Sequence, residues 1–327
     1  MSPYCPTVLI DVRLDADLAA VPDAVAELEE AGVGGVFTYE GPNDPFLPLA
    51  VAAVSSRGVA LYTNLAIAFP RSPMHLAYLA HDLQRASAGR FSLGLGTQVR
   101  THVTRRFGAT WESPVAQMRE WLGAVRAIQH SWATGEPMSF EGRWTQHTYC
   151  PPLFVPQPAE PAPLLIGGLG PRMVALAVEA ADGLLVHPFC TDGSVQALLA
   201  DVPAGFPVIG QTIVGLASTE EELAQARTAA RGLVAFYAST PAYRRVLDVH
   251  GWGELQGELQ GLTRAGRWAD LPAAVPDEVL DAVALLGSPA DVGVGLRRRF
   301  PGSARVALST PHPVPTPLLA ELVAAVA

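Results

Sequence analysis

Short apolar runs recur along this chain, and each is followed by a stretch with the spacing of an amphipathic helix. The runs read as buried strands at residues 8–12, 35–39, 59–67, 91–95, 164–166, 183–187, 207–215 and 305–309. The first four follow one another at intervals of roughly 25 to 35 residues, the size of a βα repeat. Strands this short and this apolar are typical of a parallel sheet buried on both faces. The series therefore predicts a (β/α)8 barrel of the TIM type, formed by residues 1–327 as a single domain.

Two longer stretches interrupt this alternation, and both predict insertions into the barrel. One follows the fourth strand, at residues 113–163, and contains a long helix and a small hairpin at 138–149. The other follows the seventh strand and is helical from about residue 241 to residue 283. The first insertion is as consistent with a lid over a pocket as with a surface excursion. A doubly wound open sheet is the main alternative fold, but it needs fewer strands, and no GxGxxG motif follows the first strand.

Composition argues against several classes of function. The net charge is −9, whereas a general nucleic-acid binder normally carries a basic face. No apolar run reaches the roughly 18 residues of a membrane span, and the N-terminus lacks the pattern of a secretion signal. Cys5, Cys150 and Cys190 are too few and too scattered to predict a disulfide framework or a zinc site. We therefore expect a cytoplasmic protein that acts on a small molecule and has no metal site.

Polar residues lie at the ends of the predicted strands, where a barrel places its active site. Glu40 follows the second strand and is a candidate general base or a hydrogen-bonding anchor. Asn64 stands in the apolar third run, where a buried amide needs partners. The histidine with the strongest claim is His102, which closes the polar segment after the fourth strand, and His187 ends the sixth strand. The glycines Gly167, Gly168 and Gly170 follow the fifth strand and can offer backbone N–H groups to a phosphate.

The sequence contains no nucleophile elbow, phosphate-binding loop or set of metal ligands, and a barrel with little chemistry of its own often borrows a cofactor. Four segments of the chain are informative when they are taken together: Gly94-Leu95-Gly96-Thr97, AFPRSPMHLA at 68–77, ADGLLVHP at 181–188 and LLGSPADV at 285–292. In their order and spacing they resemble the luciferase-like monooxygenase superfamily. The resemblance covers nearly the whole chain and is closest to the branch of oxidoreductases that use the deazaflavin coenzyme F420.

The resemblance implies a homodimeric barrel whose mouth holds a flavin or deazaflavin ring. It also implies a bulge in the third strand, with a non-prolyl cis peptide bond near Asn64-Leu65 that supports the ring. The glycine turn after the fifth strand would contact the phosphate side of the cofactor. The residues expected at the cofactor are Asn64, Leu65, Ala66, Gly96, Thr97, His102, Gly167, Gly168, Gly170 and His187.

The function that follows from the resemblance is hydride transfer between reduced coenzyme F420 and a small organic substrate. Glu40 and His102 would place or protonate that substrate. Two alternatives remain open: a two-component monooxygenase that uses reduced FMN and oxygen, and a barrel that has lost catalysis and acts as a binding or accessory protein.

The chain departs from the family pattern at two points. Glu40 is followed by Gly41, whereas several deazaflavin enzymes carry a histidine at the second position. The sequence also lacks lysine, which often binds the phosphate or the acidic tail of the cofactor. Arg100, Arg105 and Arg106 are the candidates to replace it.

Overall fold

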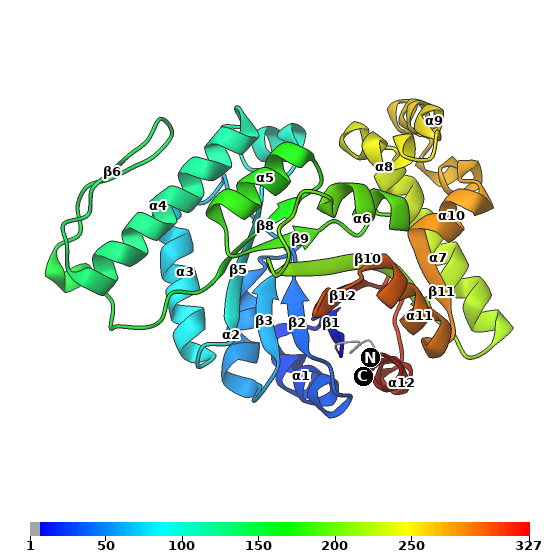
Figure 1. The fold of residues 1–327 in the computed structure, drawn as a ribbon, viewed down its shortest axis with the longest axis horizontal. Coiled ribbons are helices and arrows are strands. Elements are labelled where there is room, and N and C mark those ends of the chain that lie inside the picture. The colour runs from blue at the N-terminus through cyan, green and yellow to red at the C-terminus, as the bar shows by residue number, and fades with distance from the viewer. Residues whose placement is uncertain (1–6) are drawn as a thin grey trace.

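The computed structural model describes residues 7–327, so Cys5 lies outside the described residues. Eight parallel strands close into a ring, because the last strand pairs with both the first and the seventh. Each of the eight positions in the ring is called a stave below, because one of them is formed by two short strands. In chain order the staves are β1 (Leu9–Arg13), β2 (Gly35–Thr38), β3 (Ala60–Thr63) continued by β4 (Ala66–Ile67), β5 (Phe91–Gly96), β8 (Leu164–Gly168), β9 (Gly183–Val186), β10 (Val208–Leu216) and β12 (Arg305–Ser309). The predicted (β/α)8 barrel is confirmed (Figure 1).

Helices follow the staves and bury their apolar faces against the outer wall of the barrel. They are α1 (Val21–Glu30), α2 (Phe46–Ser55), α3 (Pro73–Ala86), α4 (Pro114–Thr134), α5 (Pro171–Ala180), α6 (Asp192–Leu199), α7 (Glu220–Ala238), α11 (Pro289–Arg299) and α12 (Thr316–Val326). In α3 the apolar spacing places Leu76, Ala80 and Leu83 in the core. A capping box begins α7, since the side chain of Thr219 accepts from the amide of Glu222.

Both predicted insertions are present. The first carries a two-stranded antiparallel hairpin, β6 (Phe140–Glu141) and β7 (Gln146–His147), which projects from the body beside α4 (Figure 1). The carboxylate of Glu120 accepts the amide N–H groups of Arg143, Trp144 and Thr145 at 2.7–2.8 Å and so fixes the turn of the hairpin. The second insertion comprises η4 (Pro241–Tyr243), α8 (Arg244–Asp248), α9 (Gly253–Arg264), η5 (Trp268–Asp270), η6 (Pro272–Ala274) and α10 (Asp277–Val283).

One strand was not predicted. β11 (Ala284–Gly287), which is not among the predicted strands, pairs in parallel with the second half of β10. The first half of β10 pairs with β9 only at Val208 and Ile209. Beyond Ile209 the two strands separate, which leaves a gap in the wall of the barrel. Arg299 fills this gap, with Nη1 donating to Thr212 Oγ1 and to the carbonyl oxygen of Val283, both at 2.6 Å. A buried arginine needs such a set of acceptors to offset the loss of water.

The inside of the barrel is a packed core. Phe37, Tyr62, Leu165, Leu185 and Ala307 fill it, with Leu65 and Ile209 partly buried against them. Below them the buried Asp11 accepts from the Tyr62 hydroxyl at 2.8 Å and pairs with Arg305, and burial raises the pKa of Asp11 to about 6. The barrel therefore offers no through-passage, and its mouth at the carboxyl ends of the strands is where a ligand can enter.

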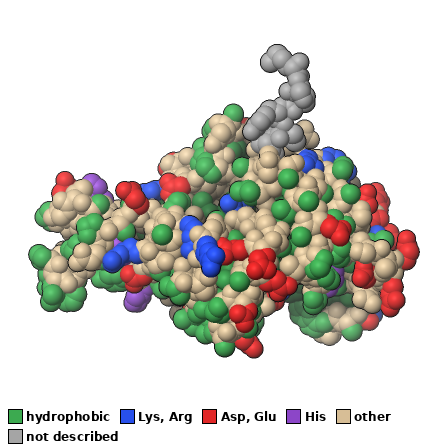
Figure 2. All heavy atoms as spheres, turned by 90° about the horizontal axis from the view of Figure 1, so that it is seen from below, with side chains coloured by type: hydrophobic (Ala, Val, Ile, Leu, Met, Phe, Trp, Pro, Cys, Tyr) green, Lys and Arg blue, Asp and Glu red, His purple; other side chains and the backbone are tan. Residues whose placement is uncertain are grey.

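The outer surface carries the negative charge of the chain. On the face shown in Figure 2, acidic side chains lie in several groups, the largest from the centre to the right, with small groups of arginines among them. None of the helices within residues 7–327 combines the length and apolar character that a membrane crossing requires. Cys150 and Cys190 are free thiols.

Candidate active site

The third stave carries a bulge at the mouth of the barrel. β3 pairs with β5 at Leu61–Phe91, and β4 resumes the pairing at Ala66–Leu95. Five residue steps on one strand thus face four on the other, which leaves one extra residue. The peptide bond between Asn64 and Leu65 is cis, at the position that the family resemblance implied.

Thr63 bridges the gap that the bulge opens between the two strands. Its hydroxyl donates to the carbonyl oxygen of Gly94 at 2.6 Å and accepts from the amide of Gly94 at 2.9 Å. A Cβ at position 94 would collide with the carbonyl oxygen of Thr63, so only glycine permits this approach. The glycine of the sequence motif is therefore required by the bulge itself.

Glu40 anchors the far side of the bulge. Its Oε2 accepts from the amide of Ile67 at 2.7 Å and from Arg71 Nη1 at 2.6 Å, while its own amide donates to the carbonyl oxygen of Leu65 at 3.1 Å. The carboxylate is buried, and Arg71 also pairs with Asp44. Of the two interpretations of Glu40, this geometry favours the anchor over the general base, because its carboxylate is already paired with a guanidinium.

Leu65 lies over two of the predicted cofactor glycines. A Cβ on Gly96 would lie 2.5 Å from Leu65 Cδ1, and a Cβ on Gly167 would overlap Leu65 Cδ2. The bulge, β5 and β8 therefore meet at this side chain. Gly168 lies elsewhere, because a Cβ there would meet Leu184 and Val174 on the outer wall.

Asn64 presents a donor without a partner. Its backbone amide donates to the carbonyl oxygen of Thr38 at 2.6 Å, but its side-chain Nδ2 is buried and has no hydrogen-bond partner among residues 7–327. Leaving a buried donor unpaired costs about 1–3 kcal/mol. Ala66, next along the bulge, is fully buried. The unpaired amide therefore fits a site that is completed by a bound group with an acceptor atom.

The polar segment after β5 folds back on itself. Trp111 Nε1 donates to the carbonyl oxygens of Thr97 and Gln98, both at 3.2 Å. His102 begins a short helical turn, is exposed, and forms no side-chain hydrogen bond to another described residue. Arg106 donates to the carbonyl oxygen of Gly41, so it is engaged with the loop after β2. The structure thus brings Thr97 to the strand end but does not join His102 to the other candidates.

Tyr39 occupies the space beside Gly41. A Cβ on Gly41 would lie 2.6 Å from Cε2 of the Tyr39 ring. The guanidinium of Arg13, at the end of β1, lies 5.7 Å from the centroid of the same ring. The position that holds histidine in several deazaflavin enzymes is therefore covered by an aromatic ring in this chain.

An aromatic wall encloses His187 at the end of β9. Its ring centroid lies 4.4 Å from that of Tyr243 and 4.9 Å from that of Tyr237. Burial lowers the pKa of His187 to about 3 and raises the pKa of Tyr243 to about 12. The two tyrosines come from α7 and from the second insertion. Neither tyrosine was predicted as a site residue, because an aromatic side chain in a helical stretch is normally interpreted as core.

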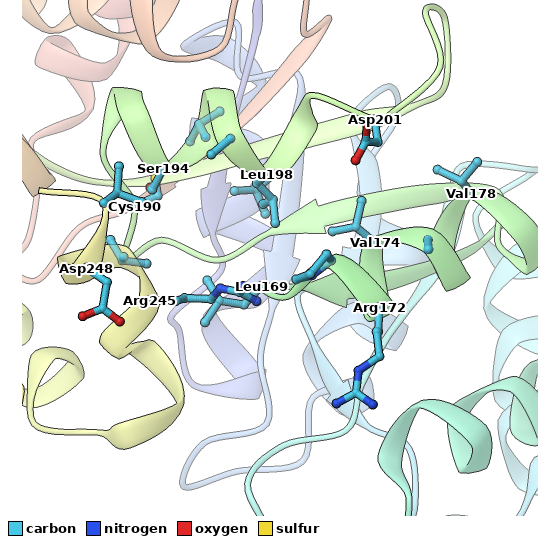
Figure 3. A pocket seen from close by; sticks show the side chains of 17 residues that line it. Leu169, Arg172, Val174, Val178, Cys190, Ser194, Leu198, Asp201, Arg245 and Asp248 are labelled. Carbon is cyan, nitrogen blue, oxygen red and sulfur yellow. The ribbon is translucent and has the colours of Figure 1, made fainter. Parts of the chain in front are cut away.

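A cavity of about 870 Å³ begins at the same glycine turn, between α5, α6 and α8. Its walls are mostly apolar side chains such as Val174, Val195 and Val246. Figure 3 shows Arg245 reaching from α8 toward Leu169, and a Cβ on Gly170 would lie 2.5 Å from Arg245 Nη1. Arg245 forms no salt bridge within the described part of the chain. The turn after β8 is therefore flanked by an arginine that the sequence analysis did not single out.

Comparisons with known proteins agree with this fold. An uncharacterised protein of Mycobacterium tuberculosis (strain H37Rv) is 40% identical over 307 residues, covering 90% of each chain. A putative coenzyme F420-dependent oxidoreductase of the same organism is 28% identical over 301 residues, covering 81% of this chain and 83% of that one. The F420-dependent tetrahydromethanopterin reductase of Methanopyrus kandleri shares the fold, with a TM-score of 0.78 at 18% identity and 97% coverage of both chains. A family model described as luciferase-like monooxygenase matches residues 5–301, and the chain therefore belongs to that family.

Proposed function

We propose that this protein is an oxidoreductase that transfers a hydride between coenzyme F420 and a small organic substrate. The observation that carries the proposal is the bulge at Asn64-Leu65. Three neighbouring staves hold it through Glu40, Thr63 and Gly94, and it presents an unpaired amide at the barrel mouth. Such an arrangement supports a planar ring that offers hydrogen-bond acceptors along its edge.

The relatives favour the deazaflavin over other rings. Two of the proteins compared above are named for their dependence on coenzyme F420, and one of them is a sequence relative over most of the chain. When bound, the deazaflavin supplies the hydride chemistry, and the protein supplies position and electrostatics. In the proposal Leu65, Gly96 and Thr97 form the surface beneath the ring, and Asn64 and the buried Ala66 shape the bulge behind it. Glu40 keeps that surface in place.

The negatively charged arm of the cofactor has a candidate partner at the segment Gly167–Gly170, whose first two glycines end β8 rather than follow it, as the sequence had predicted. This segment precedes the N-terminus of α5, where the helix dipole favours an anion. Arg245 lies against Gly170 and has no acidic partner among the described residues. All 22 basic residues of the chain are arginine, so arginine is the side chain that meets this anion. Arg106 is a weaker candidate because it donates to the carbonyl oxygen of Gly41.

The roles of the two remaining candidates follow from their places. His102 is exposed on the turn after β5, where it would meet the substrate at the rim. Glu40 acts as a positioning residue, since its carboxylate is shared between Arg71 and the amide of Ile67. A second candidate function, oxygenation with reduced FMN, is favoured by the description of the matching family model. The same bulge suits either ring.

An anaerobic turnover assay tests the proposal. Purified protein is mixed with reduced F420 and a panel of small ketones, aldehydes and imines, and the visible absorbance of oxidised F420 is followed. We expect at least one carbonyl or imine compound to oxidise the cofactor only when the protein is present. The matched arm uses reduced FMN with oxygen and the same panel. Product formation in the FMN arm alone would contradict the proposal and support the FMN-dependent monooxygenase instead.

A further inference from the structure

We infer that His187 donates a hydrogen bond through its Nε2–H group to an oxygen atom of the substrate, and that Tyr237 and Tyr243 hold its ring for this purpose. The inference rests on the proposed function and deepens it. It names the substrate class as a compound with oxygen on the reacting carbon, either a carbonyl or the corresponding alcohol.

The tautomer of His187 follows from one hydrogen bond. The backbone amide of Phe189 lies 3.1 Å from His187 Nδ1 and is able only to donate. Nδ1 must therefore be the acceptor and carry no proton. The neutral ring then carries its single proton on Nε2. A local turn of the backbone thus fixes which nitrogen is the donor.

The ring is also kept neutral. Tyr243 from η4 packs against it at an interplanar angle of 32°, and Tyr237 from α7 meets it nearly edge-on at 79°. Burial is what lowers the pKa of His187, and no carboxylate near the ring offsets it. Burial and the neighbouring Tyr243 raise the pKa of Tyr237, and the guanidinium of Arg13, beyond this wall, acts to lower it. A cation beyond the tyrosine does not favour protonation of the imidazole.

The position of His187 turns its donor toward the barrel mouth. Leu185 lies in the interior core with Phe37 and Tyr62, and His187 is two residues further along the same stave. Alternation along an extended strand places both side chains on the inner face. Nε2 has no partner in residues 7–327, yet it is not one of the fully buried unpaired atoms. His187 is half-buried, so this unpaired donor is open to a ligand.

A fixed, neutral N–H group has a defined chemical use. It cannot act as a general base, because Nδ1 is occupied and Nε2 is protonated. It polarises an oxygen on which negative charge develops, as preorganised donors in other active sites do. In carbonyl reduction the hydride adds to carbon, the π pair moves to oxygen beside Nε2–H, and water supplies the proton that completes the alcohol. The reductant is the reduced F420 of the proposed function, which is oxidised as it gives up the hydride.

Nuclear magnetic resonance tests the donor directly. The protein is labelled with 15N-histidine, loaded with F420, and the signals of His187 are identified by their loss in His187→Gln. We expect an Nε2–H tautomer that persists across neutral and mildly acidic pH, and a saturable shift of that N–H signal as acetone, the probe, is added. An Nδ1–H tautomer, or a signal that acetone leaves unmoved, would overturn the inference.

Kinetics separate this inference from the proposed function. With the carbonyl compounds found in the anaerobic assay, His187→Phe should lower kcat by about 10²-fold, the loss typical of one oxyanion donor. His187→Gln restores an N–H near Nε2 and should recover much of the rate. F420 affinity should stay within about twofold in both variants, and His130→Gln, at an exposed position on α4, is the control. An unchanged kcat in His187→Phe would contradict only the donor role of His187. Absence of F420 turnover in the wild type would instead contradict the proposed function.

Discussion

The hydroxyl of Thr63 both donates to the carbonyl oxygen and accepts from the amide of Gly94, at 2.6 and 2.9 Å. One side chain thereby replaces the backbone bonds that β3 and β5 would otherwise share at the bulge. Because position 94 lacks a Cβ, the two strands remain close enough for both bonds. The bulge that we assign to the cofactor thus depends on a threonine and a glycine that are 31 residues apart.

Thr63→Val removes these bonds while keeping the shape of the side chain. Each buried backbone group of Gly94 that is left unpaired should cost about 1–3 kcal/mol. We expect a lower free energy of unfolding in chemical denaturation and weaker binding of F420 in the same variant. Thr228→Val on α7 removes a comparable hydroxyl bond at an exposed site and serves as the control. Equal stability of the two variants would show that the Thr63 bridge does not hold the bulge.

Gly96→Ala tests the contact with Leu65. The added methyl would lie 2.5 Å from Leu65 Cδ1, so the leucine must shift. We expect weaker F420 binding in Gly96→Ala and a partial recovery in the double variant with Leu65→Ala, which removes the conflicting atoms. The four titrations form a double-mutant cycle. Strictly additive effects would mean that the two residues do not meet in solution.

Glu40→Gln distinguishes an anchor from a general base. The amide keeps an acceptor for Ile67 but loses the charge that pairs with Arg71, at a cost of about 2 kcal/mol for a hydrogen bond between charged groups. We expect lower stability and weaker F420 binding, with the pH dependence of kcat unchanged. Asp44→Asn removes the exposed partner of Arg71 and should cost under about 1 kcal/mol. Loss of one limb of the pH profile in Glu40→Gln would instead identify Glu40 as the base.

The lowered pKa of His187 predicts how the free energy of unfolding depends on pH. Its pKa is about 3 in the folded protein and near 6.5 in the unfolded chain, so the unfolded state binds the proton first. The contribution of His187 is complete above about pH 6.5 and is lost as pH falls toward 3. The difference in unfolding free energy between wild type and His187→Gln should shrink by about 1.4 kcal/mol per pH unit in that window. A constant difference would mean that the ring is not protected by Tyr237 and Tyr243.

The strand pattern was sufficient to predict the barrel, because strands buried on both faces form apolar runs that are visible without any contact information. It did not predict β11, whose four residues look like the approach to a helix. Whether these residues form a strand depends on the gap beside β10 and on Arg299, which are features of tertiary packing.

The candidate site was predicted only in part, for a similar reason. Leu65, Gly96 and Gly167 lie at the ends of successive staves, so their meeting follows from the fold. The partnership of Glu40 with Arg71, and the enclosure of His187 by Tyr237 and Tyr243, depend on loops and on an insertion that no local pattern positions. His102 was the first histidine to be singled out, yet the contacts of the folded chain single out His187.

The most direct test of the account is an equilibrium titration of the purified protein with F420 and, separately, with FMN, followed by cofactor fluorescence. We expect saturable binding of F420 that is tighter than that of FMN and is weakened in Thr63→Val. Arg245→Gln should also weaken F420 binding, and the loss should be larger at low salt than at high salt. The substitution removes a charge contact that salt would screen. Tight binding of FMN with no binding of F420 would contradict the account.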